Sequence, residues 1–176
     1  MITAEKTEAN FKIQNSFWNT FQQFKFDLIY YSLHFSRCVK IIRTIKYVTL
    51  GATALATSVW MAWNHIRWVS IICPIIILVL QVFTAVSDQF PFENRKLEIR
   101  EMTTELDKLY IEMEANWRKI ANGDLKESQI RKLISDYEIK RDEIEKHYFK
   151  NDSLPENAKL VDKATEKTHD YFETFI

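Results

Sequence analysis

Residues 47–63 (YVTLGATALATSVWMAW) and residues 69–86 (VSIICPIIILVLQVFTAV) are two uncharged, apolar stretches that decide the fold. Only the five residues NHIRW separate them. At the rise of an α-helix each stretch spans roughly 26 Å, and one further turn reaches the ~30 Å hydrocarbon core of a bilayer. Helices joined by so short a turn run antiparallel. The pair therefore predicts a transmembrane hairpin over residues 47–88, and the alternative is a buried hairpin in a soluble helical bundle.

Aromatic residues at the ends of the two stretches favour the membrane hairpin. Tyr47 stands at one edge, and Trp60, Trp63 and Trp68 stand at the other. Trp and Tyr concentrate at the headgroup level of a bilayer, where one end of the ring is dry and the other wet.

The composition predicts an all-α protein. Among 176 residues there are only 2 Gly and 3 Pro, which are the residues that most often end helices. We expect an amphipathic N-terminal region over 1–46 and cytoplasmic helices over 93–121, 125–149 and 155–173 in a C-terminal region, 89–176. Gly123 is expected to end one helix in the left-handed conformation, and capping boxes are expected at Asp124 with Glu127 and at Ser153 with Glu156.

The distribution of charge predicts the orientation. Residues 1–46 carry seven Lys/Arg and three Asp/Glu, residues 47–87 carry Arg67 alone, and residues 88–176 carry sixteen Lys/Arg and twenty-one Asp/Glu. Basic residues flank the two stretches on the side away from the turn. The positive-inside rule then places both termini in the cytoplasm of a cell whose plasma membrane the chain crosses twice.

Two helical faces outside the hairpin are apolar and need a partner. The first steps by three and four residues from Phe17 to Phe35, and the second forms a heptad-like, coiled-coil seam from Ile99 to Ile120. The first face is expected to lie on the C-terminal helices, on a neighbouring subunit or in the headgroup layer. We assign these residues to contacts in a homo-oligomer of four or more subunits, with a tetramer favoured: Phe17, Phe21, Phe24, Tyr31, Phe35, Ile99, Met102, Leu106, Leu109, Met113 and Trp117.

Polar residues recur along one face of each apolar stretch. Such stripes on adjacent helices are what a water-filled path through an oligomer needs. The alternative is that each hydroxyl bonds to the carbonyl one turn earlier, or to the other helix, without any pore. The residues predicted to line a pore are Thr49, Thr53, Thr57, Asn64, Gln81, Thr84 and Asp88.

Arg37, Lys40, Arg43 and Lys46 form a basic patch directly before the first stretch. Two interpretations stay open, since Lys and Arg attract the anionic headgroups of membrane lipid and also bind the phosphates of a nucleotide or oligonucleotide.

Signatures of an enzyme are missing from the sequence. Two isolated glycines cannot form a phosphate-binding loop, and the four His residues are scattered. Cys38 and Cys73 fall near the cytoplasmic membrane edge and inside a predicted span, so we expect neither a zinc site nor a disulfide framework. We expect no catalytic residue, no metal and no cofactor.

The order of these segments resembles the SLATT family of two-span membrane effectors from bacterial conflict systems. An aromatic helix ending in RCVKIIRTIKYV, a five-residue turn between two spans and the helix LEIREMTTELDKLYIEME carry the resemblance, over about residues 10–125. It implies an oligomeric pore, or ion channel, in the bacterial inner membrane. Such a pore depolarises the membrane and arrests growth in antiviral (anti-phage) defence, under control of a nucleotide signal from a separately encoded nucleotidyltransferase. The alternative function is a membrane-anchored scaffold without conductance.

Overall fold

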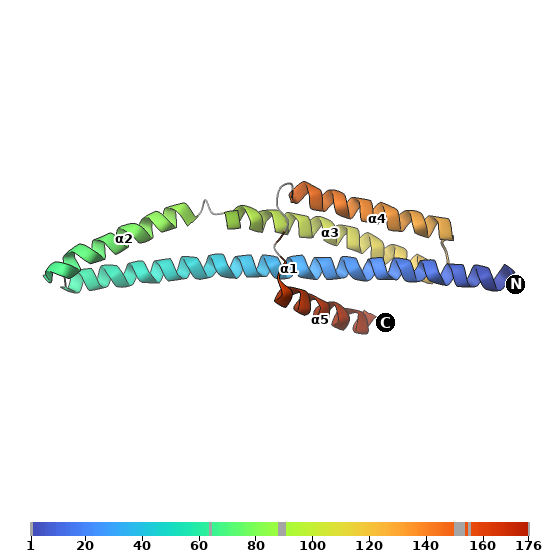
Figure 1. The fold of residues 1–176 in the computed structure, drawn as a ribbon, viewed down its shortest axis with the longest axis horizontal. Coiled ribbons are helices and arrows are strands. Elements are labelled where there is room, and N and C mark those ends of the chain that lie inside the picture. The colour runs from blue at the N-terminus through green and yellow to red at the C-terminus, as the bar shows by residue number, and fades with distance from the viewer. Residues whose placement is uncertain (1, 64, 88–90, 150–153, 155, 176) are drawn as a thin grey trace. The chain divides into compact units, whose positions relative to one another are not determined.

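The structure is a computed structural model that describes residues 2–63, 65–87, 91–149, 154 and 156–175, with side chains described outside 2–10, 83–94 and 175. Five helices follow one another along the chain (Figure 1): α1 (Ile2–Trp63), α2 (Arg67–Ser87), α3 (Pro91–Ala121), α4 (Glu127–Tyr148) and α5 (Ala158–Phe175). Every regular element in this described part is helical, which confirms the all-α prediction.

The helices form two compact units. One unit, the helical bundle, joins Met1–His34 to Glu98–Ile176, and the other, the hairpin unit, comprises Phe35–Leu97. α1 contributes to both units because it runs 62 residues without a break. The helix therefore continues past residue 46, where we expected the N-terminal region to end.

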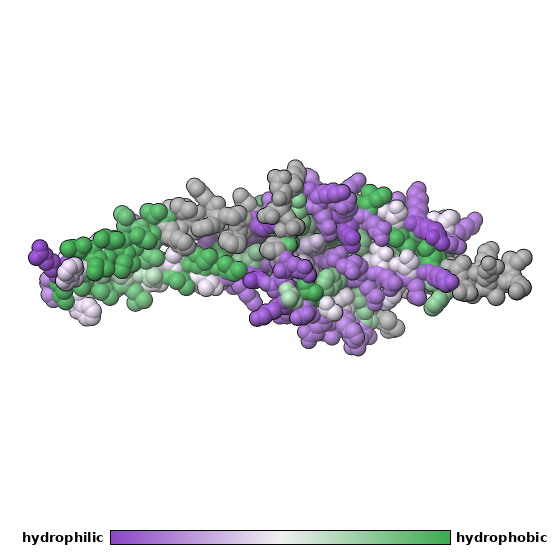
Figure 2. Space-filling model, in the orientation of Figure 1, coloured by the Kyte–Doolittle hydropathy of each residue, from purple (hydrophilic) through white to green (hydrophobic). Residues whose placement is uncertain are grey.

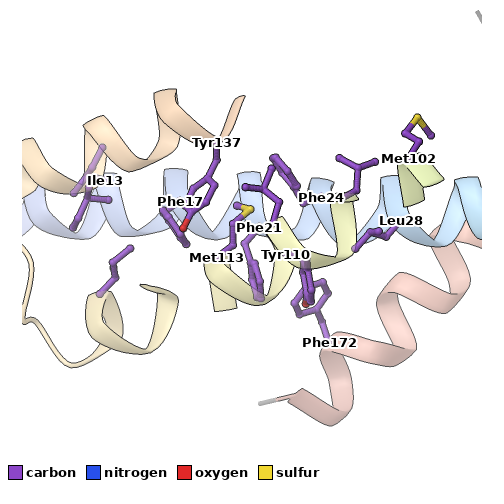
Figure 3. Close-up of a cluster of buried hydrophobic side chains, with 14 residues drawn as sticks. Ile13, Phe17, Phe21, Phe24, Leu28, Met102, Tyr110, Met113, Tyr137 and Phe172 are labelled. Carbon is purple, nitrogen blue, oxygen red and sulfur yellow. The ribbon is translucent and has the colours of Figure 1, made fainter. Parts of the chain in front are cut away.

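The core of the helical bundle is built from the periodic apolar faces of its helices. Five residues of α1, from Ile13 to Leu28, are buried at steps of four, four, three and four. They pack against α3, α4 and α5 (Figure 3) in a cluster that also holds Met102, Leu106, Leu109, Tyr110, Met113, Ile120, Ile130, Tyr137 and Phe172. Full burial of each such side chain contributes about 1.5–3 kcal/mol, so this core holds the bundle together.

This packing places most of the residues that we assigned to contacts between subunits inside one chain. Phe17, Phe21, Phe24, Ile99, Met102, Leu106, Leu109 and Met113 are buried within one chain, and Tyr31, Phe35 and Trp117 are half-buried. A side chain without exposed surface in a single chain has no surface left to offer a second copy. The aromatic face of α1 packs on the C-terminal helices, which was one of the alternatives.

The cap expected at Gly123 is present in the bundle, but the capping box expected at Asp124 is not. Gly123 has a φ of 80°, as predicted, and completes a Schellman motif, since its N–H donates to the Ile120 carbonyl and the Asp124 N–H donates to the Lys119 carbonyl, both at 3.0 Å. The capping box at Asp124 and Glu127 was wrong, because α4 begins at Glu127 and its N-cap is Lys126. Instead, the Gln129 side chain accepts a bond from the Lys126 N–H at 2.9 Å.

The last helix also begins later than expected. α5 starts at Ala158, and the Asn157 side chain accepts a bond from the Leu160 N–H at 3.3 Å, which makes Asn157 the cap. Ser153 of the expected capping box lies outside the described residues.

Candidate functional site

The surface of the hairpin unit is the first candidate for function, because its large apolar side chains point outward. On α1, the exposed residues include Val48, Leu50, Leu55, Val59, Trp60, Met61 and Trp63, and on α2 they include Trp68, Ile71, Ile72, Ile75, Ile76, Leu78, Val79 and Val82. Leu50 keeps 70% of its surface exposed and Trp68 keeps 72%. Figure 2 shows this apolar surface over α2 and the end of α1.

The less exposed side of α1 over residues 49–57 carries small and polar residues, whereas that of α2 also carries Val69, Ile77 and Leu80. Thr49 and Cys73 are buried, and Ala52, Thr53, Ala56 and Thr57 are half-buried. Large apolar side chains are thus more exposed on this unit than in most soluble folds, where the largest exposed apolar patch is usually a few hundred Å². Such an arrangement needs a non-aqueous neighbour, either lipid or other protein.

The predicted threonine row is present on α1, and its hydroxyls are satisfied within the helix. Thr49 Oγ1 donates to the Ile45 carbonyl at 2.5 Å, and Thr53 and Thr57 donate to the carbonyls of Thr49 and Thr53 at 2.8 Å. This is the back-bonding that we gave as the alternative to a pore. It lowers the cost of placing hydroxyls in an apolar medium, and it does not by itself provide donors to a water path.

Of the other residues predicted to line a pore, the structure describes the side chain of Gln81. Gln81 is exposed on α2, far inside the apolar run. The Thr84 side chain, Asn64 and Asp88 lie outside the described residues.

A search of the described residues finds no helix with a window that is both long and apolar enough to cross a membrane.

The basic patch lies on α1 within the hairpin unit, as one continuous piece of helix. Arg37, Lys40, Arg43 and Lys46 are all exposed. Burial raises the pKa of the half-buried Cys38 thiol, and the guanidinium groups of Arg37 and Arg95 oppose that rise. Both arginines therefore act on one thiol, although they belong to α1 and α3.

A polar network inside the helical bundle was not expected from the sequence. Arg141 Nη1 of α4 contacts Asp27 Oδ2 of α1 at 3.2 Å, and the Tyr31 hydroxyl donates to Glu145 Oε1 at 3.0 Å. The pKa of Asp27 is raised to about 6, because burial raises it by more than Arg141 and a hydrogen bond from Gln23 lower it. The available signal was Asp27 itself, a carboxylate set between the buried positions 24 and 28 of one helical face.

Lys25 occupies a second polar position in the bundle. Its Nζ lies 4.5 Å from the ring centre of Tyr110 and 3.8 Å from that of Tyr171, and so joins α1 to α3 and α5. Burial lowers the pKa of Lys25, and Asp107 and Glu114 oppose the decrease. The ammonium group of Lys25 therefore contacts rings from two other helices of the bundle.

Two open hollows lie on the surface of the bundle. One, of about 480 Å³, runs between α1 and α5 and is lined by Asn19, Gln22, Gln23, Phe26, Thr165, Thr168, His169, Phe172 and Glu173. The other, of about 320 Å³, is lined by Tyr30, Tyr31, Asp142, Glu145, Lys146, Phe149 and Leu154. Both are open to solvent and lined by polar and apolar side chains, and neither contains a residue of the threonine row or the basic patch.

One exposed group in the described part could hold a metal ion. His169, Asp170 and Glu173 bring their ligand atoms within 4.8 Å of one another at the end of α5. All three are exposed, and such acidic surface groups are common without any metal.

Comparison of the chain with protein-family models, with curated proteins and with solved structures gave no match. The site is therefore defined by its own geometry, and the resemblance to the SLATT family stays a prediction.

Proposed function

We propose that the chain is one subunit of a homo-oligomeric membrane pore, with its hairpin in lipid and its helical bundle in the cytoplasm. The observation that carries the proposal is the exposed apolar surface of the hairpin, with small and hydroxyl-bearing residues on the less exposed side of α1. Lipid-embedded helices associate in this way, since small residues let two backbones approach and large ones face acyl chains.

Assembly follows from Gln81. Its amide is exposed on a helix whose neighbouring side chains are isoleucine, leucine and valine. A primary amide in hydrocarbon costs several kcal/mol unless its donors and acceptors are bonded. Since one hairpin cannot surround an amide or enclose water, other subunits supply the partners, and a ring of Gln81 residues beside the threonine row forms the wall of the path.

The regulation and setting of the pore come from the resemblance to the SLATT family. We propose an effector of anti-phage defence in the bacterial inner membrane, opened or closed by a nucleotide signal from a separate nucleotidyltransferase, which depolarises the membrane and arrests growth. In this function the chain has no catalytic residue.

The second candidate is a membrane-anchored scaffold without conductance, and the back-bonded threonines favour it. Hydroxyls that are already bonded to Ile45, Thr49 and Thr53 do not require water. In that case the bundle recruits a partner and the spans only anchor it.

Conductance of the purified oligomer in planar bilayers tests the proposal. Gln81→Leu and Thr53→Val should each reduce conductance and growth arrest at least tenfold, whereas Thr104→Val should leave both unchanged. Thr104 is the matched control, because its hydroxyl also donates to the carbonyl one turn earlier, at 2.9 Å, but on the exposed side of α3. Growth arrest that survives Gln81→Leu, with no conductance in any variant, would establish the scaffold instead.

A further inference from the structure

Charge in this chain separates between the two structural units. Residues 35–97 contain seven Lys/Arg and two Asp/Glu, a net charge of +5, and the remaining residues contain seventeen Lys/Arg and twenty-two Asp/Glu, a net charge of −5. The neutral total therefore conceals a basic hairpin unit. All but one of its basic residues belong to the two segments 37–46 and 95–96, and Arg67 stands apart at the turn.

The two basic segments belong to the same unit, although almost fifty residues separate them. Arg37 and Arg95 both oppose the rise that burial causes in the pKa of the Cys38 thiol, which agrees with this placement. We call these six residues the basic collar: Arg37, Lys40, Arg43, Lys46, Arg95 and Lys96.

The collar residues of α1 lie directly before the apolar surface. Successive basic residues on α1 are three positions apart, so each is displaced by about 60° around the helix from the last, and the four cover about half its circumference over roughly 14 Å. Tyr47, Val48 and Leu50 then follow as exposed apolar residues. Charges spread in this way do not converge on one point, which a pocket for a single free phosphate requires.

We propose that the basic collar binds the phosphates of anionic phospholipids in the cytoplasmic leaflet. This inference rests on the proposed function, since it needs the hairpin in a membrane. A headgroup layer extends around every side of a helix that crosses it, so long basic side chains on different sides of α1 can each reach lipid phosphate. Lys and Arg pair with lipid phosphate by charge and hydrogen bonding, and each contributes about a fivefold gain in binding to an anionic surface.

The test uses the full chain reconstituted into vesicles of phosphatidylcholine alone and of phosphatidylcholine with phosphatidylglycerol. We expect insertion into both, with enrichment of phosphatidylglycerol around the protein measured by energy transfer from its tryptophans to a labelled lipid. Arg37→Gln with Arg95→Gln should reduce this enrichment about 25-fold, as should high salt. Lys126→Gln with Lys132→Gln, at exposed positions of α4 and its cap, is the matched control and should change nothing.

The outcomes separate the lipid collar from the proposed pore. Insertion without preference for phosphatidylglycerol, or a preference that the collar variant retains, would overturn the collar and leave the membrane hairpin standing. Loss of enrichment on addition of millimolar inorganic phosphate, at constant ionic strength, would identify free phosphate as the ligand and also overturn it. Failure to insert into either vesicle would remove both proposals.

Discussion

Asp27 of α1 and Arg141 of α4 form an ion pair inside the helical bundle, with 3.2 Å between Oδ2 and Nη1. The Asp27 side chain retains 16% of its surface and that of Arg141 retains 30%. Partial burial of both ions makes the pair sensitive to pH. The free-energy cost of removing the carboxylate from water is larger than its favourable interaction with Arg141.

Acid should stabilise the bundle of the wild-type chain relative to that of the Asp27→Asn variant. Burial raises the pKa of Asp27 from 3.8 to about 6, so the folded chain binds a proton more tightly than the unfolded chain between these values. The contribution of Asp27 to the free energy of unfolding therefore falls as the pH rises through that window. Thermal unfolding in neutral detergent should show Asp27→Asn gaining about 2 kcal/mol relative to wild type between about pH 4.5 and 7.5.

Asp142→Asn is the control for loss of a carboxylate at the surface, because Asp142 forms an exposed ion pair with Lys146 at 2.6 Å. A relative stability of Asp27→Asn that does not change with pH, or changes in the opposite direction, would contradict the buried carboxylate.

Phe21 should be among the most costly residues of the bundle to truncate. It is fully buried, and its ring stacks on Tyr110 with 4.8 Å between ring centres. Phe21→Ala should lower the free energy of unfolding by about 3–5 kcal/mol, measured by denaturant titration. Phe11, which is 62% exposed, provides the control, and Phe11→Ala should change the stability by less than about 0.5 kcal/mol. Equal losses at the two positions would refute the packing.

Gly123 should resist substitution because of its backbone rather than its surroundings. Its φ is +80° and nothing would meet an added Cβ within 4 Å. Gly123→Ala should therefore cost about 1 kcal/mol through strain alone. Gly51 is the other glycine and is equally unobstructed, but it lies within α1, so Gly51→Ala should cost nothing. A tolerated alanine at position 123 would show that the Schellman turn is absent.

The helices and their buried faces could be predicted because a period of three to four residues is written directly in the sequence. Phe17, Phe21 and Phe24 illustrate this, since their spacing predicts one face and all three are buried. What lies opposite that face could not be predicted, because a seam that fits a second subunit also fits a helix of the same chain. The structure assigns the face to α3, α4 and α5.

Local sequence patterns could not predict the polar contacts between helices. Tyr31 and Glu145 lie 114 positions apart, and no spacing rule connects such residues. The capping box was wrongly predicted for a similar reason. Asp124 is a residue type that suits the start of a helix, but it lies in the turn that ends α3 at Gly123. Likewise, the sequence of one chain does not identify what contacts the exposed apolar surface of the hairpin.

The contact of the hairpin with lipid is tested most directly by quenching of its tryptophans. A Trp18→Phe, Trp117→Phe variant leaves only Trp60, Trp63 and Trp68, which surround the turn and are exposed on the single chain. In vesicles that contain phospholipids brominated along their acyl chains, we predict strong quenching with blue-shifted emission. Unquenched, red-shifted emission from a chain that stays in the aqueous fraction would contradict the membrane hairpin, and the pore with it.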